Sequence, residues 1–191
     1  MKVWRPDSVS EARALMDRGV RPVAGGTAVQ LDWAAGRARP AEMADLSALG
    51  LDGVEADSDG WTIGATCPLA RLDDAVADDL PLLAAALRDV AAPAIRGMAT
   101  LGGTIGWGAG CLLPALLTLD ARLEVADADG TAGHALADWL AAPRGLILSI
   151  RLPRRHVGRW TWRKTGLRAA LTPSVIAVAG LRAEDGARLA A

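Results

Sequence analysis

The chain has 191 residues, of which 51% are hydrophobic, and a formal net charge of −1 at pH 7. This length suits one domain or two small lobes and allows a substantial core. The dispersed basic residues argue against nucleic-acid binding, no apolar run approaches the ~20 residues that span a bilayer, and the two cysteines lack metal-ligand spacing. We therefore expect a soluble, cytoplasmic protein with no metal site and no nucleic-acid or membrane partner.

The N-terminal quarter of the sequence alternates predicted helices and short strands. Residues 8–18 are predicted to form a helix, because Ser8 and Glu11 fit a capping box and Gly19 suits a helix end. A buried strand, a helix and a second strand are expected next, over residues 20–24, 27–35 and 42–46. A break between two lobes is expected near residues 50–55.

Two hairpins are predicted in the rest of the chain, around the turn sequences D-S-D-G at 57–60 and D-A-D-G at 127–130. We expect a loop or short strand over residues 96–103 and a flexible loop over 106–111. We also expect a strand over 146–152 that pairs with residues 160–164. The remaining predictions are helices over 68–76, 81–90, 114–119 and 135–141, and an apolar strand or helix start over 174–182. Hairpins mixed with helices favour an α+β fold over a purely parallel sheet.

Two glycine pairs are the strongest functional signal, Gly25-Gly26 within A-G-G-T and Gly102-Gly103 within T-L-G-G-T. Glycine allows φ > 0 and lets a ligand approach main-chain N–H groups closely, and successive N–H groups in a turn form a concave anion site. Two such turns in one small domain predict one ligand with two phosphates, held from both sides. Chance is the alternative, since 21 of the 191 residues are glycine.

Longer motifs around these pairs resemble the FAD-binding subunit of molybdenum hydroxylases, the medium subunit of carbon monoxide dehydrogenase and xanthine dehydrogenase-like enzymes. The matching segments follow the order of the family: W-R-P-D-S at 4–8 with E-A at 11–12, V-A-G-G-T at 23–27, D-L-S at 45–47, W-T-I-G-A-T at 61–66, I-R-G-M-A-T-L-G-G at 95–103, P-A-L-L at 114–117, L-D-A at 119–121, I-L-S-I at 147–150 and R-K-T-G at 163–166.

The resemblance implies an α+β, two-lobed FAD-binding fold of the vanillyl-alcohol oxidase or PCMH type, which does not use the Rossmann G-x-G-x-x-G turn. It implies one lobe over residues 1–52 and a second over residues 53–170. Residues 171–191 would be the start of a C-terminal lobe that is otherwise missing.

The resemblance also implies which residues contact FAD. Backbone N–H groups of the first loop, residues 24–29, and of the second loop, residues 99–104, would bind the pyrophosphate, and Leu148 and Lys164 would lie near the flavin ring. Trp107 would either stack on the cofactor or fill the space that a shortened loop leaves, and Lys164 would otherwise be a solvated strand residue. The expected contacts are Ala24, Gly25, Gly26, Thr27, Ala28, Val29, Ala99, Thr100, Gly102, Gly103, Thr104, Trp107, Cys111, Leu148 and Lys164, with no catalytic residue and no metal ligand.

The function that the resemblance implies is electron transfer. Electrons would pass from a molybdopterin-binding large subunit and a 2Fe-2S small subunit through FAD to an acceptor. Thr104, Trp107 and Cys111 replace polar residues of the family, so a FAD-fold binding module without redox activity remains an alternative. A stand-alone flavin oxidoreductase, with Arg96 and His134 as substrate contacts, is the third possibility.

Overall fold

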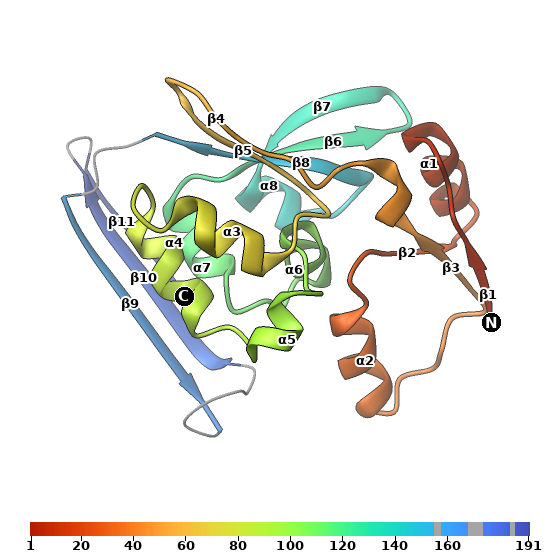
Figure 1. Ribbon diagram of the computed structural model, residues 1–191, viewed down its shortest axis with the longest axis horizontal. Helices are drawn as coiled ribbons and strands as arrows, with labels where there is room; N and C mark the ends of the chain where they lie inside the picture. Colours follow the sequence, from red (N-terminus) through yellow and green to blue (C-terminus); the bar gives the residue numbers. More distant parts are fainter. Residues whose placement is uncertain (155–157, 168–173, 184–185) are drawn as a thin grey trace.

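A computed structural model describes residues 1–154, 158–167, 174–183 and 186–191, and within them the strands form three sheets (Figure 1). The first is a parallel sheet of order β1-β3-β2, built from β1 (Lys2–Trp4), β2 (Arg21–Val23) and β3 (Glu42–Asp45). Parallel neighbours need crossover connections, which α1 (Val9–Asp17) and α2 (Thr27–Ala34) supply. A short 3-10 helix, η1 (Leu46–Leu49), directly follows β3.

The predicted elements of the N-terminal region are confirmed. The Ser8 hydroxyl accepts a hydrogen bond from the Glu11 N–H at 3.2 Å, as a capping box requires, and Gly19 has φ +81° directly after the helix. Strand β1 was not expected, because three residues ending at Trp4 are too short to show a period.

The second sheet is antiparallel and has the order β4-β5-β8-β6-β7. Its strands are β4 (Val54–Ala56), β5 (Gly60–Gly64), β6 (Arg122–Asp127), β7 (Gly130–Ala135) and β8 (Leu146–Pro153), so both predicted hairpins are confirmed. The helices associated with it are α3 (Leu69–Val76), α4 (Pro81–Arg88), α5 (Pro93–Arg96), α6 (Leu101–Trp107), α7 (Leu113–Thr118) and α8 (Leu136–Ala141).

The third sheet is antiparallel, with the order β11-β10-β9, and contains β9 (Arg159–Gly166), β10 (Ser174–Ala183) and β11 (Gly186–Ala190). The predicted pairing of residues 160–164 with 146–152 is wrong, because β5 and β6 already occupy both edges of β8. Residues 174–182, expected as a strand or a helix start, form a strand. The expected boundary after residue 170 lies outside the described residues, and β9 and β10, the strands that precede and follow it, belong to one sheet.

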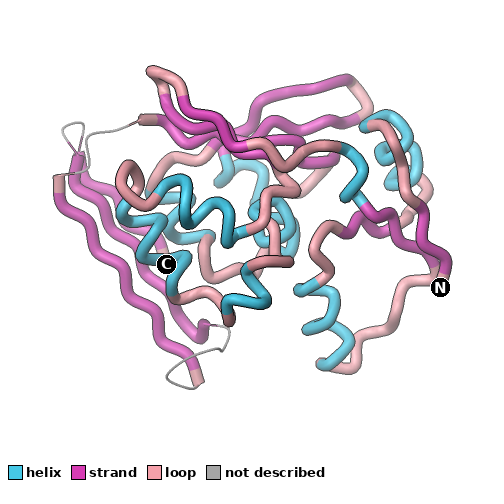
Figure 2. Tube along the Cα trace, in the orientation of Figure 1, coloured by secondary structure: helices cyan, strands magenta, loops and turns pink. Residues whose placement is uncertain are grey.

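Helices α3, α4 and α7 lie between the second and third sheets (Figures 1 and 2). One continuous apolar core joins them, with fully buried side chains from each layer such as Ile63, Leu72, Leu83, Leu116 and Leu123. The third sheet contributes Trp162, Ala177, Ala179 and Leu181 to the same core. The observed architecture is therefore mixed helix and sheet, as predicted.

The segment around the second glycine pair differs from the prediction. Residues 96–103 were expected as a loop or short strand, but α5 ends at Arg96 and α6 begins at Leu101, so both glycines lie in a first helical turn. Glycine is a poor helix former. Here the Thr100 cap and the packing of Gly102 on Ala65 outweigh that preference. Gly106 and Trp107, expected in a flexible loop, belong to the same helix.

Candidate functional site

The first glycine loop ends in an open helix N-terminus. Gly26 is the N-cap of α2 with φ +69°, a left-handed conformation that favours glycine, and no side chain caps the helix. The N–H groups of Gly26, Thr27, Ala28 and Val29 donate no hydrogen bond within the described part of the chain. The first N–H groups of a helix have no intrahelical acceptor, and together with the helix dipole they bind anions.

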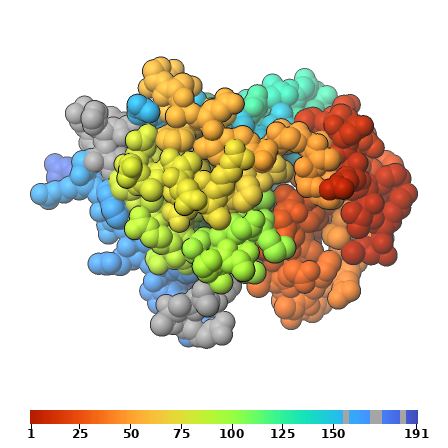
Figure 3. Space-filling model, viewed as in Figure 1, coloured from red at the N-terminus to blue at the C-terminus, as the bar shows by residue number. Residues whose placement is uncertain are grey.

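Gly25 places this loop directly against the second one. A Cβ atom on Gly25 would overlap the carbonyl oxygen of Met98 and come within 2.6 Å of the Met98 carbonyl carbon. Only glycine therefore allows the contact. In the space-filling view, the orange N-terminal region and the green surface around α5 abut (Figure 3). The two predicted loops thus meet in space although about 75 residues separate them.

The second glycine loop uses its N–H groups inside the protein. Leu101 donates to the Cys67 carbonyl at 3.1 Å, and Gly102 to the Ala65 carbonyl at 2.9 Å. Gly103 donates to the Thr100 hydroxyl at 3.1 Å, and the Thr104 N–H donates to the Thr100 carbonyl at 2.9 Å. The Ala99 N–H donates to the Ile95 carbonyl. As the loop stands, these groups are not free for the pyrophosphate bonds that were expected of them.

The second loop instead leaves room for a ligand on one face of α6. Gly103 and Gly106 are exposed and lie three residues apart, on one face of α6. A Cβ atom on Gly106 would meet nothing within 4 Å, whereas one on Gly102 would lie 2.7 Å from the Ala65 Cβ. Gly102 therefore serves packing, and the Gly103–Gly106 face lets a ligand approach the helix backbone.

A buried aspartate that sequence reasoning missed anchors α2. Asp32 is 5% exposed, and its carboxylate accepts hydrogen bonds from Arg21 at 2.6 Å and from Arg37 at 3.0 Å. The Arg21 hydrogen bond lowers the pKa of Asp32 against the opposing effect of burial, and Arg37 and the Trp107 indole act in the same direction as Arg21. The available signal was that Asp32 is the one charged residue within residues 27–34, with Arg37 five positions further on.

Trp107 therefore lies beside Asp32, at the contact between α6 and α2. Leu148 is also tied to the second loop. Its carbonyl accepts the Ala65 N–H at 2.9 Å, and the Ala65 carbonyl in turn accepts from Gly102. The Leu148 side chain packs on the cluster that contains Ala12. The two loops, Trp107 and Leu148 thus form one neighbourhood.

Lys164 and Cys111 are held by other partners. The Lys164 ammonium donates to the Asp89 carbonyl at 2.6 Å, at the C-terminal end of α4, where a cation is favourable. The Trp162 indole donates to the Asp89 carboxylate at 2.7 Å. The Cys111 sulfur accepts the Ser174 N–H from β10 at 3.4 Å.

The two residues of the stand-alone alternative are separate from each other. Arg96 donates to the carbonyls of Val90 and Ala91 at 3.3 and 3.1 Å. His134 lies on β7, with its Nδ1 3.4 Å from the Arg144 guanidinium. In the part of the chain that the structure describes, no three His, Cys, Asp or Glu side chains gather as a metal site, and no helix is long and apolar enough to cross a membrane.

This donor set fits a dinucleotide cofactor such as FAD. The open N–H groups of residues 26–29 suit its pyrophosphate, and the side-chain-free face at Gly103 and Gly106 leaves room beside them. Gly25 and the strand around Leu148 bring both sides of the site together.

Comparison with known proteins agrees with this fit. The sequence profile of the FAD binding domain in molybdopterin dehydrogenase matches residues 1–155. The chain is 34% identical to aldehyde oxidase 2 of Macaca fascicularis, over 63% of this chain and 10% of that protein. It is 30% identical to the carbon monoxide dehydrogenase medium chain of Afipia carboxidovorans strain OM5, over 78% of this chain and 57% of that one. The chain thus spans only part of both relatives.

Solved structures share the fold. A cyanide-inactivated Cu,Mo carbon monoxide dehydrogenase superposes with a TM-score of 0.86 and 26% identity, over 95% of this chain and 68% of the other. Quinoline 2-oxidoreductase from Pseudomonas putida 86 has a TM-score of 0.86 and 20% identity, over 99% and 72%, which is a likeness of fold. The chain belongs to the family of FAD-binding domains of molybdopterin dehydrogenases, and its cofactor is FAD.

Proposed function

We propose that this chain carries FAD within a molybdenum hydroxylase-type oxidoreductase and passes electrons through it to an acceptor. The single observation that carries the proposal is the open N-terminus of α2, with free N–H groups at residues 26–29, held against the second glycine loop. The matched family and the medium chain of carbon monoxide dehydrogenase support it.

The two-lobed arrangement of the vanillyl-alcohol oxidase or PCMH type is part of the proposal. Residues 1–52 contain the parallel sheet, and residues 53–170 contain the second sheet and strand β9 of the third. Among the described residues, no strand pairing joins the parallel sheet to either of the other two. The cofactor would lie where α2 faces α6. The order of two small α/β units without a Rossmann turn supports this arrangement.

The residues of the site fall into groups with different roles in this proposal. The N–H groups of Gly26–Val29 bind the pyrophosphate, while Ala24 and Gly25 form the turn that delivers them. Ala99, Thr100, Gly102, Gly103 and Thr104 form the opposite wall, and Trp107 and Leu148 border it. Bound FAD supplies the capacity to accept and release electrons, and the protein binds, orients and shields it.

Cys111 and Lys164 contribute only after a rearrangement. Cys111 must leave the Ser174 N–H, and Lys164 must leave the Asp89 carbonyl, to reach a ligand between α2 and α6. We propose that Lys164 acts through its positive charge near the flavin rather than as a proton carrier. The electron donors, a molybdopterin subunit and a 2Fe-2S subunit, are separate chains in this proposal.

A comparison of two flavins tests the proposal. FAD has a pyrophosphate and riboflavin has none, so the open N–H groups should make FAD bind about 100-fold more tightly, which corresponds to about 2.7 kcal/mol. Titrations of the purified protein, followed by flavin fluorescence and thermal shift, measure both affinities, and ADP-ribose should compete with FAD. Equal affinities would mean that the flavin ring, which both ligands share, supplies the binding energy, and would contradict the proposed role of α2. No binding of either flavin would favour the redox-inactive module.

A further inference from the structure

The buried carboxylate of Asp32 joins three parts of the molecule. It accepts hydrogen bonds from Arg21 on β2 at 2.6 Å and from Arg37 at 3.0 Å, and the third donor is the indole N–H of Trp107 on α6. Asp32 is 5% exposed. A carboxylate has about four acceptor positions, so these three donors satisfy most of them and hold the side chain in one orientation.

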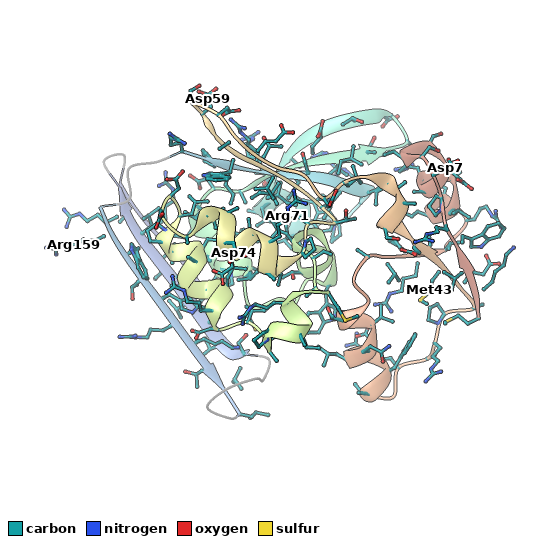
Figure 4. All side chains as sticks on the ribbon, in the orientation of Figure 1. Asp7, Met43, Asp59, Arg71, Asp74 and Arg159 are labelled. Carbon is teal, nitrogen blue, oxygen red and sulfur yellow. The ribbon has the colours of Figure 1, made fainter. Side chains whose placement is uncertain are left out.

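The ion pair of Arg21 and Asp32 fixes the first glycine loop. The two residues are 11 positions apart, and the loop lies between them, after β2 and before α2. Arg21 is paired with Met43 of β3, and side chains at one level of a sheet point to the same face. Figure 4 shows Met43 between the N-terminal sheet and α2. The strand before the loop and the helix after it are thus joined through side chains, which orients the free N–H groups of residues 26–29.

Trp107 connects this unit to the second glycine loop. It follows the glycines of α6 directly, so it borders the bare face of that helix. One contact between the two walls of the site is Gly25 against Met98. The bond from Trp107 to Asp32 is a second contact, about 9 Å along α2 from its N-cap. The open N–H groups and the bare glycine face therefore lie between two points at which the walls touch.

Orientation explains a buried carboxylate at this place better than stability does. Taking an ion pair out of water is costly, and well-packed apolar residues of similar volume are often at least as stabilising. An apolar contact between α2 and α6 would let the helices slide, whereas a bond from the one polar atom of an indole to Asp32 defines a single arrangement.

We propose that Trp107 is a positioning residue for FAD that acts through Asp32. Its N–H bond keeps α6 against α2 in the free protein, so FAD meets a site whose two walls are already in place. When only a fraction of the molecules has the closed site, the observed affinity falls by that fraction. This inference rests on the proposed function in one point, that FAD lies between α2 and α6. It assigns the role of Trp107 to its N–H and not to stacking of its ring on the cofactor.

Two replacements of Trp107 test the role of the N–H. Trp107→Phe keeps an aromatic ring, and benzothienylalanine at the same position keeps the shape of tryptophan with sulfur in place of the N–H. Both should raise the FAD dissociation constant about tenfold, or about 1.4 kcal/mol, which is the size of one hydrogen bond to a charged group. Calorimetric titration of the purified variants measures the affinity.

Trp139→Phe is the matched control. The Trp139 indole on α8 donates to the Arg144 carbonyl at 2.8 Å, away from the glycine loops. Its loss removes a comparable hydrogen bond and should lower the unfolding temperature without changing FAD affinity. In the FAD-free protein, amide hydrogen exchange of α2 should become faster in both Trp107 variants and stay unchanged in Trp139→Phe.

The outcomes separate this inference from the proposed function. A parent protein that binds no FAD contradicts the proposed function. A parent that binds FAD, with a Trp107→Phe variant that binds it equally well, contradicts only the role of the N–H and favours ring stacking. If Trp107→Phe binds FAD weakly but benzothienylalanine restores the parent affinity, Trp107 fills space, and the inference is again wrong. Unchanged hydrogen exchange of α2 in both Trp107 variants would also overturn it.

Discussion

The two glycine loops have nearly the same sequence but use glycine in different ways. The first ends in an uncapped helix whose leading N–H groups are free, and its Gly26 has φ +69°. The second is capped by Thr100, and its N–H groups bind carbonyls of Ala65, Cys67 and Thr100 or the Thr100 hydroxyl. The first loop therefore offers donors to an anion, and the second offers a bare helix face.

This difference shows that a glycine pair does not by itself define a phosphate cradle. The N–H groups of a helix start are available only when no side chain or neighbouring carbonyl satisfies them. Thr27 follows its glycines and leaves the cap position to Gly26, whereas Thr100 precedes its glycines and takes that position itself. The two loops thus differ in whether a threonine occupies the N-cap position, and only the loop without that cap has free N–H groups.

Gly25→Ala should have the largest effect on the two loops. The new Cβ would overlap the Met98 carbonyl oxygen, so the two loops must separate. We expect the FAD dissociation constant to rise about 100-fold and stability to fall by about 1–3 kcal/mol, as in other overpacked sites. Flavin fluorescence titration and urea unfolding measure the two effects.

Gly53→Ala is the matched control, since a Cβ there would meet nothing within 4 Å and Gly53 has no positive φ. It should leave both quantities within error of the parent. If Gly25→Ala bound FAD as tightly as Gly53→Ala does, the close contact of the loops would have no part in the site.

A second pair of variants separates packing from ligand space within α6. Gly106→Ala should stabilise the free protein by about 0.5–1 kcal/mol through helix propensity, because its Cβ meets nothing within 4 Å. The same methyl group should weaken FAD binding about tenfold if the cofactor lies against this face. In that case, thermal unfolding without FAD would show a more stable protein, whereas titration would show weaker FAD binding.

Gly102→Ala should instead destabilise the protein. Its Cβ would lie 2.7 Å from both the Cβ and the carbonyl oxygen of Ala65, so we expect a loss of about 1–3 kcal/mol of stability. Tighter or unchanged FAD binding by Gly106→Ala would show that the ligand does not approach the helix at this face.

The sequence could predict elements that depend on local signals. The Ser8 cap, the two D-x-D-G hairpins and the proline-started helix α4 were all expected, because a cap, a turn or a fixed φ acts within a few residues. The meeting of the two loops was expected from motif resemblance, and the contact between Gly25 and Met98 agrees with it.

Features set by distant contacts could not be predicted in this way. The partner of β9 depended on both edges of β8 being occupied, and the helical start at Leu101 depended on acceptors at Ala65 and Cys67. The buried role of Asp32 likewise required Arg21 and Arg37 to converge on it from separate elements. Of these partners, only Arg37 lies within a local window of sequence, five residues from Asp32.

The anchor of the open loop predicts an acid sensitivity. Hydrogen bonding from Arg21 lowers the pKa of Asp32 in the folded protein, so this stabilisation is present above the unfolded pKa of about 3.9 and is lost as the pH falls through the lower folded value. Asp32→Asn should lower the unfolding temperature at pH 7 and flatten its decline between about pH 5 and pH 3. Asp74→Asn, which removes an exposed carboxylate from α3, is the matched control.

The last expected effect concerns the cap that closes the second loop. The Thr100 hydroxyl accepts the Gly103 N–H at 3.1 Å, and removal of a helix N-cap costs about 1 kcal/mol. Thr100→Ala should lose that amount in urea unfolding, and Thr100→Ser, which keeps the acceptor, should lose little. The same change frees the Gly103 N–H and makes the second loop more like the first. If Thr100→Ala then bound FAD more tightly than Thr100→Ser does, the occupied N–H group would be the feature that distinguishes the two loops, whereas equal affinities would assign the difference to the shape of the glycine face.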